Sequence, residues 1–212
     1  MTEDGGLQLL DVRITLGDAL LVELSLSIAP GEVVTLMGPS GSGKSTLLAW
    51  MTGTLPGAFT ASGRIVSAGL DITETAPEDR RLGLLLQDDL LFPHMSVGQN
   101  LLFGCRSGTR SARRKRVRQA LADIGLEGYA PRDPATLSGG QRARVALLRT
   151  LLAEPRALLL DEPFSKLDAD RRDRVRRFVF ARARADGLPT LLVTHDEADA
   201  EAAGGRIVRL GA

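Results

Sequence analysis

The chain has 212 residues, of which 43% are hydrophobic and 25% charged, the balance of an ordinary globular protein with one sizeable core. A formal net charge of +1 excludes a strong overall field for nucleic acid or acidic lipid. The single cysteine, Cys105, excludes an internal disulfide and a cluster of thiolate metal ligands. We find no signal peptide and no apolar run of the roughly 18 residues that a membrane helix needs. We therefore expect a partner to hold the chain at any membrane where it works.

The N-terminal part predicts short strands that lead into a glycine-rich loop. Apolar and polar residues alternate over residues 20–28, a pattern typical of half-buried strands, and Pro30-Gly31 marks a turn. The predicted elements are, in chain order, strands within residues 7–28, a buried strand over 33–37, a helix over 45–52, loop and short strands over 57–70, and a strand over 82–86.

The middle of the chain, about residues 88–150, predicts a mostly helical insert. Two sets of apolar residues recur at helical spacing there: Val117, Leu121 and Ile124, then Val145, Leu148 and Leu152. Afterwards, the apolar runs 157–160 and 190–193 are typical of central strands in a parallel sheet. The predicted helix between them, about residues 169–185, carries on one side Val175, Phe178, Val179 and Arg182. Strands and helices in this alternation predict an α/β core.

The glycine-rich loop matches the P-loop pattern G-x-x-x-x-G-K-[ST] between a predicted strand and a predicted helix. Its glycines let backbone N–H groups face a phosphate, and the helix adds its positive dipole end. Lys44 supplies a positive charge for the β- and γ-phosphates, and the Ser45 hydroxyl is a hard ligand for Mg²⁺. The predicted ATP-binding residues are Gly38, Pro39, Ser40, Gly41, Ser42, Gly43, Lys44, Ser45 and Thr46.

Two adjacent acids, Asp161 and Glu162, follow the apolar run 158–160. Ligands bind at the carboxyl ends of strands in open α/β sheets, so both acids are expected beside the phosphate loop. Asp161 is predicted to hold Mg²⁺, and Glu162 to act as general base on the attacking water.

A second polar, glycine-rich stretch, Leu137-Ser138-Gly139-Gly140-Gln141, precedes a predicted amphipathic helix, with Ser138 placed as its N-cap. One ATP hardly needs two helix N-termini from distant parts of one chain. Two copies arranged head to tail would use both.

With these motifs the sequence resembles the ATP-binding subunits of ABC (ATP-binding cassette) transporters over nearly its whole length. The resemblance makes residues 137–141 the signature motif, which contacts the ATP held by the partner copy. It makes Gln87 a ligand of Mg²⁺ and the water, Asp168 part of the D-loop, and His195 the switch histidine at the γ-phosphate. Catalysis is thereby assigned to Glu162, His195 and Gln87, and Mg²⁺ binding to Ser45, Gln87 and Asp161.

The resemblance implies one ABC ATPase domain over residues 1–212. Residues 1–87 and 151–212 would form the P-loop core and an N-terminal antiparallel β subdomain, and about 88–150 the helical signature subdomain. It also implies a homodimer on ATP binding, with a heterodimer as the alternative. The expected partners are transmembrane permease subunits and a periplasmic substrate-binding protein, with no direct contact to nucleic acid. The expected location is the cytoplasmic face of the membrane.

Residues 91–100 resemble the segment after Gln87 in compact importer subunits, so import is the favoured direction. An exporter or lipid-extraction ATPase is one alternative, and a soluble ABC ATPase acting on nucleic acid or the ribosome is another. Three positions depart from the family pattern: Leu16 stands where an aromatic residue stacks on adenine, Lys166 where a small residue is common, and Gln99 where an acid is frequent. The basic run 110–118 is interpreted as the solvated face of a helix.

Overall fold

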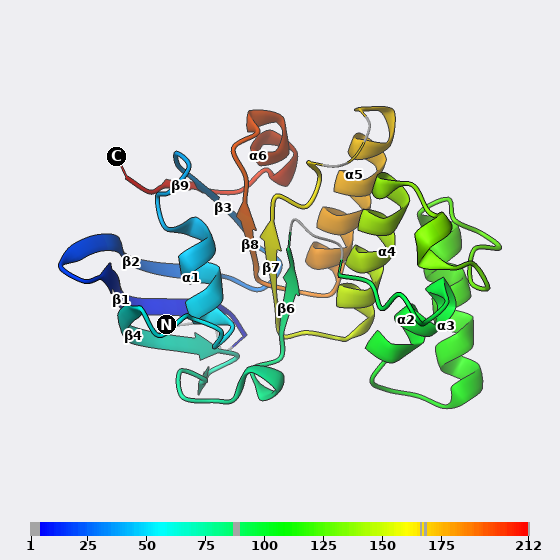
Figure 1. The fold of residues 1–212 in the computed structure, drawn as a ribbon, viewed down its shortest axis with the longest axis horizontal. Helices are drawn as coiled ribbons and strands as arrows, with labels where there is room; N and C mark the ends of the chain where they lie inside the picture. Colours follow the sequence, from blue (N-terminus) through cyan, green and yellow to red (C-terminus); the bar gives the residue numbers. More distant parts are fainter. Residues whose placement is uncertain (1–4, 87–89, 166, 168, 212) are drawn as a thin grey trace.

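A computed structural model describes residues 5–86, 90–165, 167 and 169–211 of the chain. Figure 1 shows an antiparallel sheet at one end of the molecule, a parallel sheet in the middle, and a group of helices at the other end. This is the α/β fold with an N-terminal β part and inserted helices that the sequence predicts.

The antiparallel sheet is formed by the N-terminal strands. Its order is β2 (Ala19–Ile28), β1 (Leu7–Leu16), β4 (Phe59–Ser67) and β5 (Leu70–Asp71). The prediction of short strands after residue 57 was wrong for β4, which pairs with β1 from Leu16 opposite Phe59 to Leu7 opposite Ser67, with one register shift between Leu10 and Arg13. Cross-strand hydrogen bonds extend this strand beyond what its own alternation indicates.

All neighbouring strands of the second sheet run parallel. Its order is β6 (Leu82–Leu85), β7 (Ala157–Asp161), β8 (Thr190–Val193), β3 (Val33–Met37) and β9 (Ile207–Arg209). Strands β3 and β8 are buried along their full length, as their continuous apolar runs predict. Because the strands are parallel, the loops after β3, β7 and β8 leave the sheet at the same edge.

Helices cover both faces of the parallel sheet. Helix α1 (Lys44–Met51) packs Leu47 and Leu48 into a core shared with both sheets. On the opposite face lie α4 (Gly139–Leu152) and α5 (Ala169–Ala185), side by side in Figure 1. The predicted position of Arg182 on the apolar side of α5 was wrong: Arg182 is exposed and pairs with Asp186 at 2.6 Å.

The inserted helices have a core of their own. Helix α4 packs there against α2 (Val97–Gly104) and α3 (Arg110–Asp123), and the apolar residues of the two predicted repeats are buried or partly buried in it. The basic residues of α3 lie largely on its outer face; the exposed ones are Arg110, Arg114, Lys115 and Arg118. The remaining elements are the short helix α6 (Glu197–Ala203) and the 3₁₀ turns Pro77–Asp79 and Pro134–Thr136.

Candidate active site

The loop between β3 and α1 curls tightly before the helix begins. Gly43 immediately precedes α1 with φ 87°, in the left-handed region where glycine is favoured. A Cβ at this position would lie 2.5 Å from Val22 Cγ2 of β2 and 3.2 Å from the Leu21 carbonyl oxygen. Both the backbone angle and the close approach of β2 therefore require glycine here.

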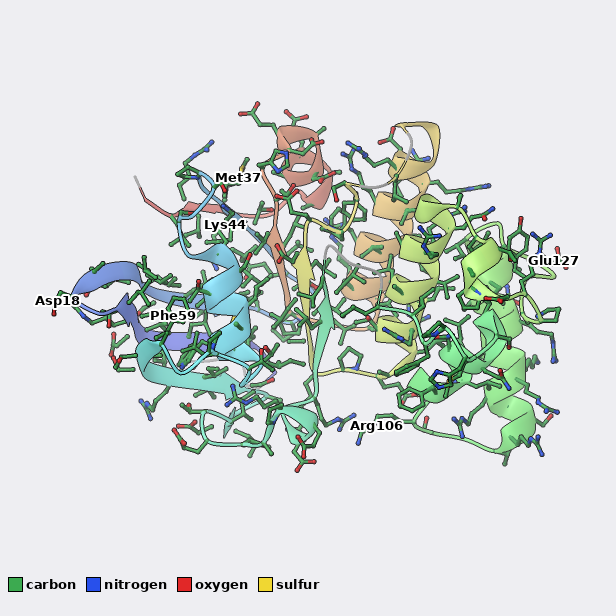
Figure 2. The ribbon with its side chains drawn as sticks, in the orientation of Figure 1. Asp18, Met37, Lys44, Phe59, Arg106 and Glu127 are labelled. Atoms are coloured by element: carbon green, nitrogen blue, oxygen red, sulfur yellow. The ribbon has the colours of Figure 1, made fainter. Side chains whose placement is uncertain are left out.

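The Lys44 side chain turns back into this loop. Its ammonium donates hydrogen bonds to the carbonyl oxygens of Gly38 and Pro39, each at 2.7 Å, and to Ser42 Oγ at 3.3 Å. Figure 2 labels Lys44 at the start of α1, beside the end of β3 at Met37. The loop thus holds a positive charge at the N-terminus of a helix, where an anion is also favoured by the helix dipole.

Asp161 ends β7 and faces Ser45 across the cleft. The Ser45 Oγ to Asp161 Oδ2 distance is 3.4 Å, although 116 positions separate the residues in the chain. Burial raises the pKa of the Asp161 carboxyl above its ordinary value, the neighbouring Glu162 raises it further, and Ser45 and Lys44 oppose the shift. A hydroxyl beside a carboxylate that burial disfavours is a donor set that a hard divalent cation would stabilise.

Glu162 and His195 form a direct pair. The distance from His195 Nδ1 to Glu162 Oε1 is 2.7 Å, and the His195 side chain is 74% exposed against 20% for Glu162. The hydrogen bond that His195 donates to Glu162, and then the charge of Glu162, raise the pKa of His195 above its ordinary value. Glu162 has φ 51°, an uncommon value for a residue with a side chain, which directs the chain sharply away from β7.

These groups share one cleft of about 510 Å³. Its lining residues are Gly38, Ser40, Gly41, Gly43, Lys44, Ser45, Thr46, Asp161, Glu162, Ser165 and His195. The structure therefore brings together the phosphate loop, the acid pair and the histidine, which the sequence places in three separate segments. Ser165 also lines the cleft; it opens the stretch 165–168 that the resemblance identifies as the D-loop, but no direct role in ATP binding was predicted for it.

The segment 137–141 lies elsewhere, at the N-terminus of α4, and does not line this cleft. Ser138 Oγ accepts from the backbone N–H of Gln141 at 3.3 Å, and Gln141 Oε1 accepts from that of Ser138 at 2.9 Å, which makes a capping box. The predicted N-cap is confirmed. Leu137 is buried, Ser138 is exposed, and Gly139 and Gly140 of the first turn are both half-buried.

Three residues singled out in the sequence, Gln87, Lys166 and Asp168, lie outside the described residues. Leu16 ends β1 beside the Gly17-Asp18 turn and is 45% exposed. Gln99, which replaces a frequent acid, accepts from the Ser96 backbone N–H at 2.8 Å in a capping box at the start of α2. An amide serves this local role as well as a carboxylate does.

The family model for ABC transporters matches residues 21–165, more than half of the chain. The chain belongs to the ABC transporter family. A relative in Escherichia coli (strain K12), named uncharacterized ABC transporter ATP-binding protein YnjD, is 52% identical over 86% of this ABC chain and 85% of its own length. The thiamine import ATP-binding protein ThiQ of Jannaschia sp. (strain CCS1) is 43% identical over 96% of this chain and 88% of its own length.

Longer ABC proteins match as well. The Fe(3+) ions import ATP-binding protein FbpC 1 of Rhizobium meliloti (strain 1021) is 43% identical over 88% of this chain, which spans 52% of that relative. Among solved structures, the dimeric structure of the bacterial ABC transporter cassette MJ0796 superposes with a TM-score of 0.81 at 30% identity. That match covers 96% of this chain and 94% of the other. A post-hydrolysis state of MJ0796, bound to ADP and Pi, gives a TM-score of 0.80.

This ABC chain is therefore an ATP-binding and ATP-hydrolysing transporter subunit. None of the helices in the described ranges has the length and apolar character needed to cross a membrane.

Proposed function

We propose that the chain drives solute import, by coupling ATP binding, dimer closure and hydrolysis to separate transmembrane permease subunits at the cytoplasmic face of the membrane. The names of similar proteins support this direction, because they are described as import ATP-binding proteins for thiamine, Fe(3+) ions and 2-aminoethylphosphonate. These cargoes are chemically unrelated, so the permease and a periplasmic substrate-binding protein would choose the cargo.

The observation that carries the proposal is the meeting of Lys44, Ser45, Asp161, Glu162 and His195 in one cleft. Lys44 would neutralise phosphate charge, with the backbone of the phosphate loop around it. Ser45 and Asp161, together with Gln87, would hold Mg²⁺, which supplies charge neutralisation to the β- and γ-phosphates when bound. Glu162 would accept the proton of the attacking water as general base, and His195, held by Glu162, would face the γ-phosphate.

A second copy would complete the site. The first turn of α4 offers a capped helix N-terminus with two glycines, a favourable end for an anion, and it lies outside the cleft of its own chain. In a head-to-tail homodimer, residues 137–141 would close over the partner's ATP, and Asp168 would lie in the D-loop between the two sites. A heterodimer with a related subunit is the alternative arrangement. The dimeric cassette structures of MJ0796 support the dimer.

The permease would dock on a groove between β6 and the inserted helices. This groove has a volume of about 420 Å³ and is lined by Leu82, Leu84, Phe92, Phe103 and Arg149 among others. Phe103 is 65% exposed, and its ring meets that of Phe92 edge-on at 4.9 Å. Exposed aromatic side chains at the rim of a groove are typical of protein interfaces.

Steady-state hydrolysis by the Glu162→Gln variant tests the catalytic part of the proposal. The amide cannot accept the proton, so we expect hydrolysis to slow by about 10²-fold or more while ATP binding persists. The measurements are phosphate release and equilibrium binding of ATP. Turnover close to that of the wild type would remove Glu162 from the role of base.

A pull-down tests the transport part. Tagged Glu162→Gln protein, held in its ATP state, is recovered from detergent-solubilised native membranes, and bound proteins are identified by mass spectrometry. A polytopic membrane protein in stoichiometric yield, together with a substrate-binding protein of the same system, would support import. A permease alone would favour export or lipid extraction, and bound nucleic acid or ribosomes would favour a soluble ABC ATPase.

A further inference from the structure

Charged and polar side chains of helices α5 and α6 form a network of hydrogen bonds and ion pairs beside the turn that carries His195. The guanidinium of Arg176, only 6% exposed, pairs through both Nε and Nη2 with the buried carboxylate of Asp199. Asp199 also accepts a hydrogen bond from Thr194 Oγ1 at 3.1 Å, and Thr194 Oγ1 accepts one from the Asp196 backbone N–H at 3.1 Å. Both neighbours of His195 in the chain are thereby tied to α6 and, through Arg176, to α5.

Arg172, one turn earlier on α5, makes a different kind of link. Its Nη1 donates to Asp196 Oδ2 at 3.0 Å, and its Nη2 donates to the carbonyl oxygen of Leu167 at 3.2 Å. The planar guanidinium keeps these two nitrogens at a constant separation. It therefore constrains the distance between the turn after β8 and the segment that follows β7.

The Leu167 segment leads back to Glu162 through short turns. The Leu167 backbone N–H donates to the Phe164 carbonyl oxygen at 3.1 Å, and that of Ser165 donates to the Glu162 carbonyl oxygen at 3.2 Å. Ser165 Oγ donates to the same Glu162 oxygen at 2.9 Å. Phe164 is fully buried against Phe180 of α5. These consecutive turns are anchored by the buried Phe164 ring, so a displacement of Leu167 is expected to move Glu162 as well.

We propose that Arg172 is a positioning residue for the Glu162–His195 pair, and that its guanidinium sets the distance between the two turns so that carboxylate and imidazole meet. The inference rests on the proposed function, because it gives this pair the catalytic roles. A purely structural role, attachment of α6 to α5, is better served by Arg176, whose partner Asp199 is buried. Arg172 is more exposed, at 26% of its side chain, and its two acceptors belong to the two turns.

The state of the His195 ring distinguishes these roles. An ionised carboxylate only accepts hydrogen bonds, so its contact with Nδ1 holds the neutral imidazole in the Nδ1–H form. Among the described residues, the charged groups that line the clefts beside this ring or act on its pKa are Lys44, Asp161, Glu162, Asp196, Glu197, Asp199 and Arg209. A variant that leaves all of them in place and separates the two turns would lower the fraction of Nδ1–H.

The experiment is imidazole ¹⁵N NMR of the full chain at alkaline pH, combined with steady-state kinetics. The chain has two histidines, so the His195 signals are assigned by their loss in His195→Asn. In Arg172→Met we expect a lower Nδ1–H fraction and a kcat reduced by about 10- to 100-fold through misplacement of the base. KM for ATP should change by less than about twofold, since the phosphate loop is untouched. Arg177→Met, at an exposed position of the same helix, should change none of these quantities.

An Nδ1–H fraction in Arg172→Met equal to that of the wild type would overturn the inference, even if kcat fell. If this variant does not fold, Arg172→Lys serves instead. It keeps the charge but presents one nitrogen to two acceptors, so the Nδ1–H fraction should again fall, and a wild-type fraction would overturn the inference. Failure of the proposed function would give a different result: the wild-type chain would not hydrolyse ATP, or Glu162→Gln would be fully active. Either result would contradict the catalytic roles, and the Nδ1–H fraction of Arg172→Met would still test whether Arg172 positions the pair.

Discussion

Two adjacent carboxyl groups at the end of β7 occupy different environments. Asp161 lies in the strand, with its charge disfavoured by burial and by Glu162. Glu162 lies past the end of the strand, in the left-handed region, and contacts His195. Adjacent acids with separate partners can take separate roles, one as ligand and one as base. The left-handed backbone of Glu162 and the burial of the Asp161 carboxylate both lower the free energy of unfolding of the ligand-free chain.

The environment of Asp161 predicts opposite effects on stability and activity. Its folded pKa is raised, so its contribution to stability is present below the unfolded pKa and is lost as pH rises through the folded pKa. At neutral pH the ionised group therefore lowers the free energy of unfolding. We expect Asp161→Asn to raise the Tm of the ligand-free chain at pH 7, and to slow Mg²⁺-dependent hydrolysis by about 10²-fold or more.

Differential scanning calorimetry and phosphate release make these two measurements. Asp71→Asn is the matched control, because the hydrogen bonds from Thr73 lower the pKa of the exposed Asp71 carboxyl. This control should not raise Tm and should leave hydrolysis unchanged. A lower Tm in Asp161→Asn would contradict our account of the site.

At the scale of elements, helices α2 and α4 begin in the same way. Each starts with a serine whose side chain accepts from the backbone of a glutamine three residues on, and that glutamine returns a contact: Ser96 with Gln99, and Ser138 with Gln141. Both caps therefore stabilise the start of their helices to a similar extent. Only the cap of α4 also lies at the helix turn that is proposed to contact the partner's ATP.

The two caps make a matched pair of variants. Ser96→Ala and Ser138→Ala should each lower the free energy of unfolding by about 1 kcal/mol, measured by urea denaturation. ATP-driven dimerisation of the Glu162→Gln background, followed by sedimentation, should weaken only when Ser138→Ala is added. Equal dimerisation of both double variants would leave Ser138 with a capping role alone.

Across the whole molecule, each end carries an exposed apolar side chain, but only one of the two lines the groove where the permease is proposed to dock. Phe103 lines the groove between β6 and the inserted helices, and Leu70, 53% exposed, lies on β5 of the antiparallel sheet. In Figure 2, Arg106 labels the side of the groove, and Phe59 labels the antiparallel sheet on the other side of the parallel sheet. If the permease docks on the groove, a charge introduced there would have to be buried in the interface, which is costly.

Phe103→Asp should therefore reduce the recovery of the membrane partner by at least about tenfold, an effect of roughly 1.4 kcal/mol. Binding of ATP to the isolated chain should stay unchanged, because the groove and the cleft have separate linings. Leu70→Asp is the control and should leave recovery unaffected. Loss of recovery in the control alone would move the docking surface to the antiparallel sheet.

Much of the fold followed from local sequence. The buried strands β3, β7 and β8, the start of α1 after Gly43 and the capped start of α4 depend on residue types within a few positions of each other. Their signals are apolar runs, helical spacing and capping side chains, all of which act between near neighbours. The edge strand β9 was missed because three residues, two of them exposed, carry no periodicity, and its pairing with β3 makes it a strand.

By itself the sequence determined which chemical groups this ABC ATPase has: the phosphate loop, the acid pair, the capped helix and His195. The assignments of Gln87 and Asp168, and the subdomain boundaries, stay predictions. Only the tertiary structure decided that Ser45 meets Asp161, that Glu162 meets His195, and that Arg172 bridges their two turns. The physical reason is the strand order β7-β8-β3, which places the ends of distant segments side by side and which no local pattern encodes.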